Sequence, residues 1–164
     1  MMPSRFHPFC LATALVVMVV LFSPSVRAED NFPLSNGQMV YVPAYSHIYM
    51  GDREQPFLLA VTLSIRNTDP STSMTVSRVG YFDSDGRLLR EYMLHPLVIK
   101  PFSSTRIVIK ESDAEGGSGA SFHVRWHAEK AINQPIIESI MIGTKSQQGI
   151  SFTSRGQVII EGAE

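Results

Sequence analysis

The stretch Ser121–Ala128, which reads SFHVRWHA, decides the fold class. Successive side chains of an extended chain point to opposite faces. One face therefore carries three large apolar side chains, and the other carries two imidazoles and a guanidinium group. The apolar residues are Phe122, Val124 and Trp126, and the polar ones are His123, Arg125 and His127. This alternation predicts a half-buried β-strand with Trp126 in the core, although a sugar-stacking role for that ring is the alternative.

The remainder of the chain after residue 28 shows the same alternation of apolar and polar residues. Short segments of alternating apolar residues are separated by turn residues, and no long amphipathic helix pattern occurs. We expect an all-β fold, an immunoglobulin-like antiparallel β-sandwich of about eight or nine strands. The predicted strand regions are 39–50, 57–66, 74–82, 87–94, 97–100, 104–110, 121–128, 136–143 and 149–160, the last holding one or two strands.

Turn chemistry connects these segments. Residues 67–70 (Asn-Thr-Asp-Pro) turn the chain, and residues 83–86 (Asp-Ser-Asp-Gly) predict a tight hairpin because Asp-Gly readily adopts positive φ angles. The second turn is also similar to the start of a calcium loop, but the twelfth position is Leu94 where such a loop needs glutamate. Residues 111–119 predict a flexible, solvated loop. A weak cation site at Asp113 and Glu115 is the less favoured alternative.

Residues 1–28 are predicted to be a secretory signal peptide. Arg5 supplies a positive start, residues 9–22 form an uncharged apolar run, and the Val-Arg-Ala triplet ending at Ala28 offers a cleavage site. The alternative is an uncleaved membrane anchor, but the run is shorter than the roughly 18 residues that a span prefers. We expect an exported protein, periplasmic or extracellular, with a single β-sandwich domain at residues 29–164 and no membrane span after cleavage.

Composition narrows the set of partners. The chain has 14 basic and 15 acidic residues, and loss of Arg5 and Arg27 with the leader would change its net charge from −1 to −3. Nucleic acid and anionic membrane surfaces are therefore disfavoured as partners. Cys10 also lies in the leader, so the mature chain would have neither a disulfide nor a thiolate nucleophile. We predict no cofactor.

The polar face of residues 121–128 is the first candidate binding surface. Same-face neighbours on a strand lie about 7 Å apart, so His123 and His127 are separated by about twice that distance and cannot readily share one metal ion. We favour a solvated or loosely paired face, on which alanine substitutions change stability by less than about 0.5 kcal/mol. A surface for an anion or a polar ligand is the second interpretation. A metal site, which would need His47 or His95 from another strand, is the third.

Two other groups of residues are candidates. Tyr41, Tyr45, His47 and Tyr49 share one parity if Pro43 does not shift the register, and could then form an aromatic strip that binds a glycan or a peptide. Because Pro43 makes the register uncertain, we favour an edge strand whose tyrosines cover the end of the core with their hydroxyls in water. Arg155 shares a parity with Ser151 and Thr153. If its strand lies beside that of Arg125, the two guanidinium groups would form a small cationic patch for carboxylate or phosphate.

Four segments together resemble the bacterial family DUF3124. They are VYVPAYSHIY (40–49), LSIRNTD (63–69), EGGSGASFHVRW (115–126) and SQQGISFTSRGQVI (146–159). The resemblance covers essentially the whole mature domain, but the family is named for its unknown function and implies no catalytic residues. Residues 63–92 are also similar to the early hairpins of exported immunoglobulin-like domains, and this likeness concerns the fold alone.

We therefore expect a non-catalytic binding or protein-interaction module for an unknown protein or a small polar or anionic ligand. Its candidate residues are His123, Arg125, His127, Arg155, Tyr45, His47 and Tyr49. No serine nucleophile is paired with a base by its spacing. The alternatives are a metal-assisted hydrolase that uses His47, His95, His123 and His127, and an envelope assembly or chaperone-like factor that offers an unpaired strand edge.

Overall fold

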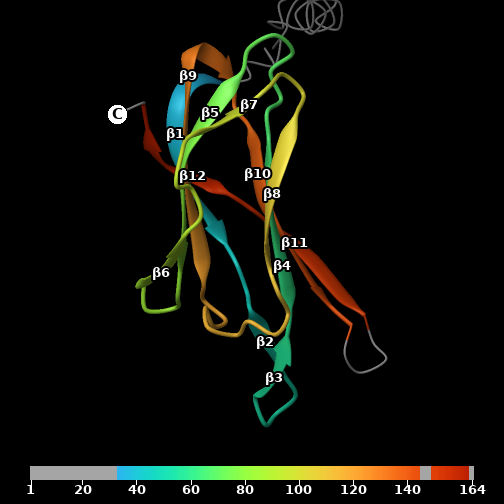
Figure 1. The fold of residues 1–164 in the computed structure, drawn as a ribbon. Helices are drawn as coiled ribbons and strands as arrows, with labels where there is room; N and C mark the ends of the chain where they lie inside the picture. The colour runs from blue at the N-terminus through green and yellow to red at the C-terminus, as the bar shows by residue number, and fades with distance from the viewer. Residues whose placement is uncertain (1–32, 145–148, 163–164) are drawn as a thin grey trace, which may run out of the picture. The chain divides into compact units, whose positions relative to one another are not determined.

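The computed structural model describes residues 33–144 and 149–162, which form an all-β domain (Figure 1). Within these residues, twelve strands form two face-to-face sheets and one short hairpin, and all pairings are antiparallel. The arrangement is that of a sandwich, as predicted. No helix in the described part of the chain is long and apolar enough to cross a membrane. The predicted signal peptide lies outside these residues.

The first sheet is built around the strand that contains the quoted stretch. Strand β9 lies between β1 and β5, and the order across the sheet is β12-β1-β9-β5-β6, with β7 also paired to β5. The strands are β1 (Leu34–Pro43), β5 (Met74–Phe82), β6 (Leu88–Glu91), β7 (Leu97–Ile99), β9 (Ser121–Asn133) and β12 (Gln157–Glu161). The predicted alternation along β9 is confirmed, because Phe122, Val124 and Trp126 are fully buried.

The second sheet has the order β11-β10-β4-β8. Its strands are β4 (Ala60–Arg66), β8 (Ser104–Ile109), β10 (Ile136–Gly143) and β11 (Ile150–Arg155), and the separate hairpin consists of β2 (His47–Met50) and β3 (Gln55–Leu58). Both sheets contribute to one apolar core, which includes Trp126 and Val124 from the first sheet and Leu63 and Met141 from the second. The Ser139 hydroxyl donates a hydrogen bond to the Pro43 carbonyl and so links β10 to β1 across the layers.

The structure has more strands than the eight or nine expected, because three predicted regions are divided. Region 39–50 breaks at residues 44–46, where the chain leaves β1 and enters the β2–β3 hairpin. Region 57–66 is divided between β3 and β4, and the last region is divided at Gly156. A Cβ atom at Gly156 would lie 2.6 Å from Val40 Cγ1, so only glycine allows the chain to pass there from the second sheet to the first.

A β-bulge in β5 changes the facing that simple alternation predicts. Alternation would place Val76 and Arg78 on one face and Val79 on the other. The register of β5 against β9 shifts between Val76 and Arg78, so that Val76, Val79 and Tyr81 are all buried while Arg78 points outward. The extra residue, Ser77, therefore keeps the charge out of the core.

The predicted turn at residues 67–70, which follows β4, is connected by side-chain hydrogen bonds to the turns after β7 and β9. The Asn67 side-chain amide donates to the carbonyls of Thr72, Ile99 and Lys100 at 2.8, 3.2 and 3.2 Å. The Thr68 hydroxyl donates to the Gln134 carbonyl at 2.9 Å, and Asp69 accepts from the backbone N–H groups of Ser71, Thr72 and Asn133. The turns after β4, β7 and β9 are thus joined at one end of the sandwich. We call residues 67–69 the turn hub.

The loop at residues 111–119 is mostly exposed or partly exposed to solvent, as expected, and specific contacts connect it to the first sheet. Arg90 pairs with Asp113 at 2.6 Å and with Glu115 at 3.0 Å, and Ser84 Oγ donates to the Gly116 carbonyl at 3.1 Å. Tyr81 packs beneath this loop, where burial and the nearby Asp113 raise its pKa to about 12. The two carboxylates bind a protein cation in place of a metal ion.

The turn hub predicts a specific loss of stability in acid. Backbone hydrogen bonds from Ser71, Thr72 and Asn133 lower the pKa of Asp69 to about 2. Its carboxylate therefore stabilises the fold above the unfolded pKa of about 4, and this contribution is lost as the pH falls from about 4 toward 2. Urea unfolding of the wild type and of Asp69→Asn should differ clearly at pH 7 and converge near pH 2. Equal differences at both pH values would contradict this role of Asp69.

Candidate functional site

The face carrying His123, Arg125 and His127 is only partly exposed to solvent. All three residues are half-buried. The His123 ring stacks on Phe82 with 4.1 Å between centroids and contacts Tyr41 at 5.4 Å. Alanine at position 123 would remove two ring contacts, each worth about 0.5–1.5 kcal/mol, so the expected change of less than 0.5 kcal/mol does not apply there. Burial, followed by the charge of Arg78, lowers the pKa of His123.

Arg125 lies on the same face, between β1 and β5. Its neighbours across the strands are Met39 and Arg78, and its Nη2 contacts Met39 Sδ at 3.7 Å. Arg78 in turn pairs with Glu91 at 2.8 Å. His127, two residues along β9, faces Gly37 and Thr75. This face is thus a packed, partly neutralised surface, which is a weaker candidate for ligand binding than the sequence indicated.

The predicted aromatic strip is divided among three places. Tyr41 packs beside His123 on the first sheet, whereas Tyr45 contacts Phe152 of β11 edge to face with 5.7 Å between centroids. His47 and Tyr49 contact each other on the β2–β3 hairpin, where His47 Nε2 lies 3.3 Å from the Tyr49 hydroxyl. The edge-strand interpretation is wrong for β1, which is paired on both sides, but not for β2, whose one partner among the described strands is β3. The four residues therefore do not form one continuous binding surface.

The described histidines do not form the ligand set that a metal-assisted hydrolase would need. His123 and His127 lie on β9, His47 lies on the β2–β3 hairpin, and His95 is exposed in the connection between β6 and β7. In the described parts of the chain, no group of three or more histidine, cysteine, aspartate or glutamate residues could hold a metal ion.

Arg155 ends β11 and lies in the second sheet. Its cross-strand neighbour is Glu138 of β10, whereas Arg125 belongs to the first sheet, so the predicted patch of Arg125 with Arg155 is wrong. Arg155 instead belongs to a row of four cross-strand neighbours that crosses the second sheet, in which the two arginines are exposed and Ser64 is buried. In order from β11 to β8, the row is Arg155, Glu138, Ser64 and Arg106. Because adjacent strands lie about 4.8 Å apart, the row spans about 14 Å.

Four adjoining pockets follow this face and the end of the sandwich next to it. The largest, of about 420 Å³, is lined by Pro33, Thr68, Asn133, Gln134, Ile136 and Arg155. It shares Arg155 and Gln134 with a smaller pocket and Thr68 with a pocket of about 250 Å³ that contains Arg66 and Phe102. Arg66 in turn lines a pocket of about 260 Å³ that ends at Arg106. We call this connected series the arginine groove.

The charge distribution along the arginine groove is one-sided. Among the described residues, three arginines line it and no acidic residue does. Glu138 lies in the same cross-sheet row but lines none of the four pockets. The ion pairs between described residues involve Arg78, Arg87 and Arg90, so the groove arginines lack carboxylate partners in the described structure. Their guanidinium groups are available to an external anion.

Phe102 projects from the turn between β7 and β8 at the rim of the groove. Its ring is 74% exposed, and its φ angle is +53°, in the left-handed region. For a residue other than glycine, this conformation costs roughly 1–2 kcal/mol. Asn67 holds the same turn through the carbonyls of Ile99 and Lys100. The fold thus maintains a strained backbone that presents an apolar ring to solvent.

Sequence reasoning identified Arg155 but missed Arg66, Arg106 and Phe102. A signal for the two arginines was present, because Arg66 shares a strand parity with Thr62 and Ser64, and Arg106 alternates with apolar Ile107. What the sequence did not supply was the order β11-β10-β4-β8, which brings them together.

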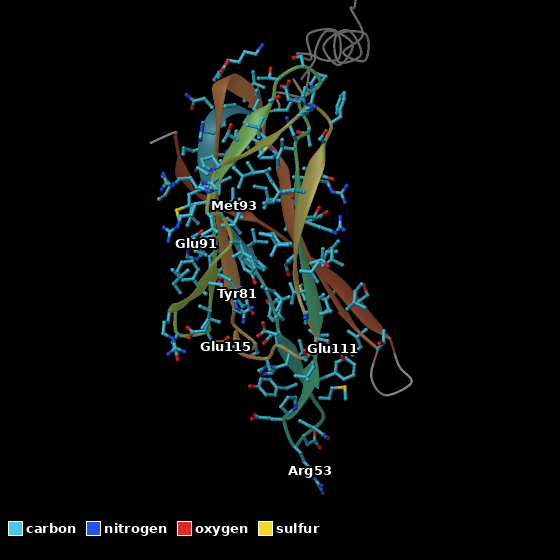
Figure 2. All side chains as sticks on the ribbon, viewed as in Figure 1. Arg53, Tyr81, Glu91, Met93, Glu111 and Glu115 are labelled. Atoms are coloured by element: carbon cyan, nitrogen blue, oxygen red, sulfur yellow. The ribbon has the colours of Figure 1, made fainter. Side chains whose placement is uncertain are left out.

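In Figure 2, Glu91, Glu115 and Tyr81 lie on or beside the first sheet, and Arg53 projects from the tip of the β2–β3 hairpin.

Comparison with known proteins identifies the family of this chain. The family described as "Protein of unknown function (DUF3124)" matches residues 37–159. No curated protein matches the chain. A solved structure described as "Crystal Structure of Thermotoga maritima 1070" has 12% sequence identity and a TM-score of 0.45, and the match covers 77% of this chain and 97% of that one. The family match confirms the resemblance seen in the four sequence segments.

The packing of His123 predicts a pH effect that is separate from ligand binding. Burial lowers the pKa of this imidazole in the folded state. The unfolded chain therefore binds the additional proton, and stability falls as the pH decreases through the unfolded pKa of about 6.5. His123→Phe keeps a stacked ring and removes the titration. Urea midpoints measured at pH 8 and pH 5 should fall more for the wild type than for this variant, and equal shifts would contradict the assignment.

Proposed function

We propose that this chain, a member of the DUF3124 family of proteins of unknown function, is an exported, non-catalytic binding module for an anionic ligand. The module comprises residues 29–164, and its primary site is the largest pocket of the arginine groove. Arg155 is the residue that binds the negatively charged group there, and Gln134 and Thr68 line the same pocket. Of the residues selected from the sequence, Arg155 is therefore retained as the central one.

One observation carries this proposal. The chain has a slight excess of acidic residues, yet among the described residues the four adjoining pockets are lined by three arginines and by no aspartate or glutamate. Arg78, Arg87 and Arg90 form ion pairs with carboxylates, whereas Arg155 forms none with a described residue, even though Glu138 is its cross-strand neighbour. A segregated set of arginines attracts anions and discriminates against cations.

The geometry of Arg155 suits a carboxylate or a phosphate. A guanidinium group presents five donors in a planar fork that can bind two oxygens at once. The pocket also contains apolar side chains from Pro33 and Ile136, so part of a bound ligand would be removed from water. The lining residues supply donors, acceptors and apolar surface but no nucleophile paired with a general base. This chemistry supports binding without a reaction.

Anion titration of the purified domain tests the proposal. Galacturonate and inorganic phosphate would be titrated into ¹⁵N-labelled protein at low and high salt. We expect shifts around Arg155 and Gln134, with weaker binding at high salt. Arg155→Ala should weaken binding about tenfold or more, since a hydrogen bond to a charged group contributes about 1.5–3 kcal/mol.

Two matched variants make this test specific. Arg53→Ala removes the same charge from the β2–β3 hairpin tip and should leave binding unchanged, while Glu138→Gln removes the acidic neighbour of Arg155 and should strengthen it. If no anion binds, or if both arginine variants weaken binding equally, the primary site is not at Arg155.

Export is tested by the fate of the first 28 residues. The leader pattern predicts cleavage after Ala28. Full-length protein produced in a Gram-negative bacterium should be released by osmotic shock, and its intact mass should correspond to a chain that begins at Glu29. Replacing two residues of the apolar run with arginine, for example Val17 and Leu21, should block release. A full-length product that stays with the cytoplasmic fraction or the membrane would contradict export or cleavage.

The second candidate function is interaction through an unpaired strand edge. The observation in its favour is that β8 is paired only to β4 among the described strands and exposes Val108. Arg106 and Lys110 stand on or beside the same edge, however, and charged residues at sheet edges oppose the addition of another strand. This candidate is therefore the weaker one.

A further inference from the structure

We infer, building on the proposed function, that the ligand is an acidic polysaccharide with carboxylate-bearing sugars. One acidic sugar binds at Arg155, and the chain continues past Arg66 to Arg106 along the arginine groove. A sugar ring between these points stacks on Phe102. The proposed function needs only one anion at Arg155, whereas this inference assigns the ligand's class, its length and the residues that recognise its other sugars.

The continuity of the groove argues for an extended ligand. Each pocket shares a lining residue with the next, through Arg155, Thr68 and Arg66 in turn. The row of residues from Arg155 to Arg106 alone spans about 14 Å. A single small acid would occupy only one of these pockets. A chain with several carboxylates can reach all three arginines at once and gains affinity from each additional contact.

The uncharged residues of the groove suit a polyhydroxylated chain. The pocket between Arg66 and Arg106 is lined by hydroxyl side chains, namely Thr62, Ser64, Ser104 and Thr105. Ser104 is exposed and Thr62 and Thr105 are partly exposed, so these hydroxyls can reach a ligand, whereas Ser64 is buried at the base of the pocket lining. Hydroxyl groups, which both donate and accept, match the alternating donors and acceptors of sugar rings.

Phe102 adds a second, independent observation. A side chain that is 74% exposed gains little from burial, and its backbone is held at a positive φ angle that disfavours phenylalanine. Strained residues of this kind concentrate at ligand sites. The ring lines the same pocket as Arg66, and the apolar face of a sugar can pack on it while the carboxylate reaches the guanidinium group.

The direction of the groove distinguishes a polysaccharide from an acidic peptide. A peptide that adds to a sheet runs along the edge strand and pairs with its backbone. The arginine groove instead passes from Arg155 of β11 by way of Thr68 and Arg66 to Arg106 of β8, so it crosses the strands of the second sheet near one end of the sandwich. A ligand in this groove is therefore contacted by side chains and does not pair with a strand backbone, which suits a polysaccharide better than a peptide.

A length series tests the inference. Oligogalacturonates of one to eight sugars would be titrated into the mature domain by calorimetry, with methyl-esterified octamers as the neutral control and octaglutamate as the peptide control. We expect affinity to rise at least tenfold from monomer to octamer. Methyl esterification should abolish binding, and octaglutamate should bind more weakly than octagalacturonate.

Three variants locate the additional contacts. Arg66→Ala, Arg106→Ala and Phe102→Gly should each reduce the octamer-to-monomer affinity ratio, by about threefold to tenfold for the ring contact. Phe102→Gly should also keep or raise the melting temperature, because glycine accepts the positive φ angle. This result separates a binding role from a structural one. Arg53→Ala serves as the charge control and should leave the ratio unchanged.

The possible failures are distinguishable. Equal affinities for monomer and octamer, with binding still dependent on Arg155, would overturn the extended ligand and leave the proposed function in place. Tighter binding of octaglutamate would overturn the polysaccharide in favour of an acidic peptide. A Phe102→Gly variant that binds the octamer normally would remove the stacking contact. Absence of any Arg155-dependent anion binding would overturn both proposals.

Discussion

The turn hub is the constraint on which the candidate site depends. Residues 67–69 follow β4, yet their side chains satisfy backbone groups in the turns after β7 and β9 as well as in their own. Each of these turns supplies a lining residue of the arginine groove, namely Phe102, Gln134 and Thr68. Buried polar groups are costly unless they are paired, so loss of one member would leave several groups without partners at once. Groove geometry and local folding are therefore coupled through three consecutive side chains.

Much of the fold was predictable because its signals are local. Alternation along β9 placed Trp126 in the core and His123 outside it, and the Asp-Gly turn predicted the β5–β6 hairpin, in which Gly86 has a φ angle of +79°. The bulge at Ser77 was not predictable, because it depends on the register between β5 and β9. The contacts of the 111–119 loop depend in the same way on Arg90, which is distant in sequence. Non-local pairing is the common reason for these differences.

The candidate site was less predictable than the fold. Arg155 was recognisable as an outward-facing cation, but its neighbours depend on strand order, which places β11 beside β10 rather than beside β9. Parity alone could not show that Arg66 and Arg106 share a surface with Arg155. The histidine stripe gave a stronger sequence signal, yet the rings of Tyr41 and Phe82 cover His123. Composition also gave no indication that the basic side chains would be separated from the acidic ones along this groove.

Gly156 lies immediately after Arg155, at the point where one segment passes from the second sheet to the first. An added Cβ atom would collide with Val40 of one layer and with the Ile137 carbonyl of the other. The two positions are thus constrained for different reasons, Gly156 by the packing of the two layers and Arg155 by the proposed binding of an anion. If Arg155 binds the proposed anion, a mutational scan scored by cellular abundance would register substitutions at 156 and overlook those at 155, and one scored by ligand capture would register both. Two adjacent residues would then separate the evolutionary cost of misfolding from that of lost recognition.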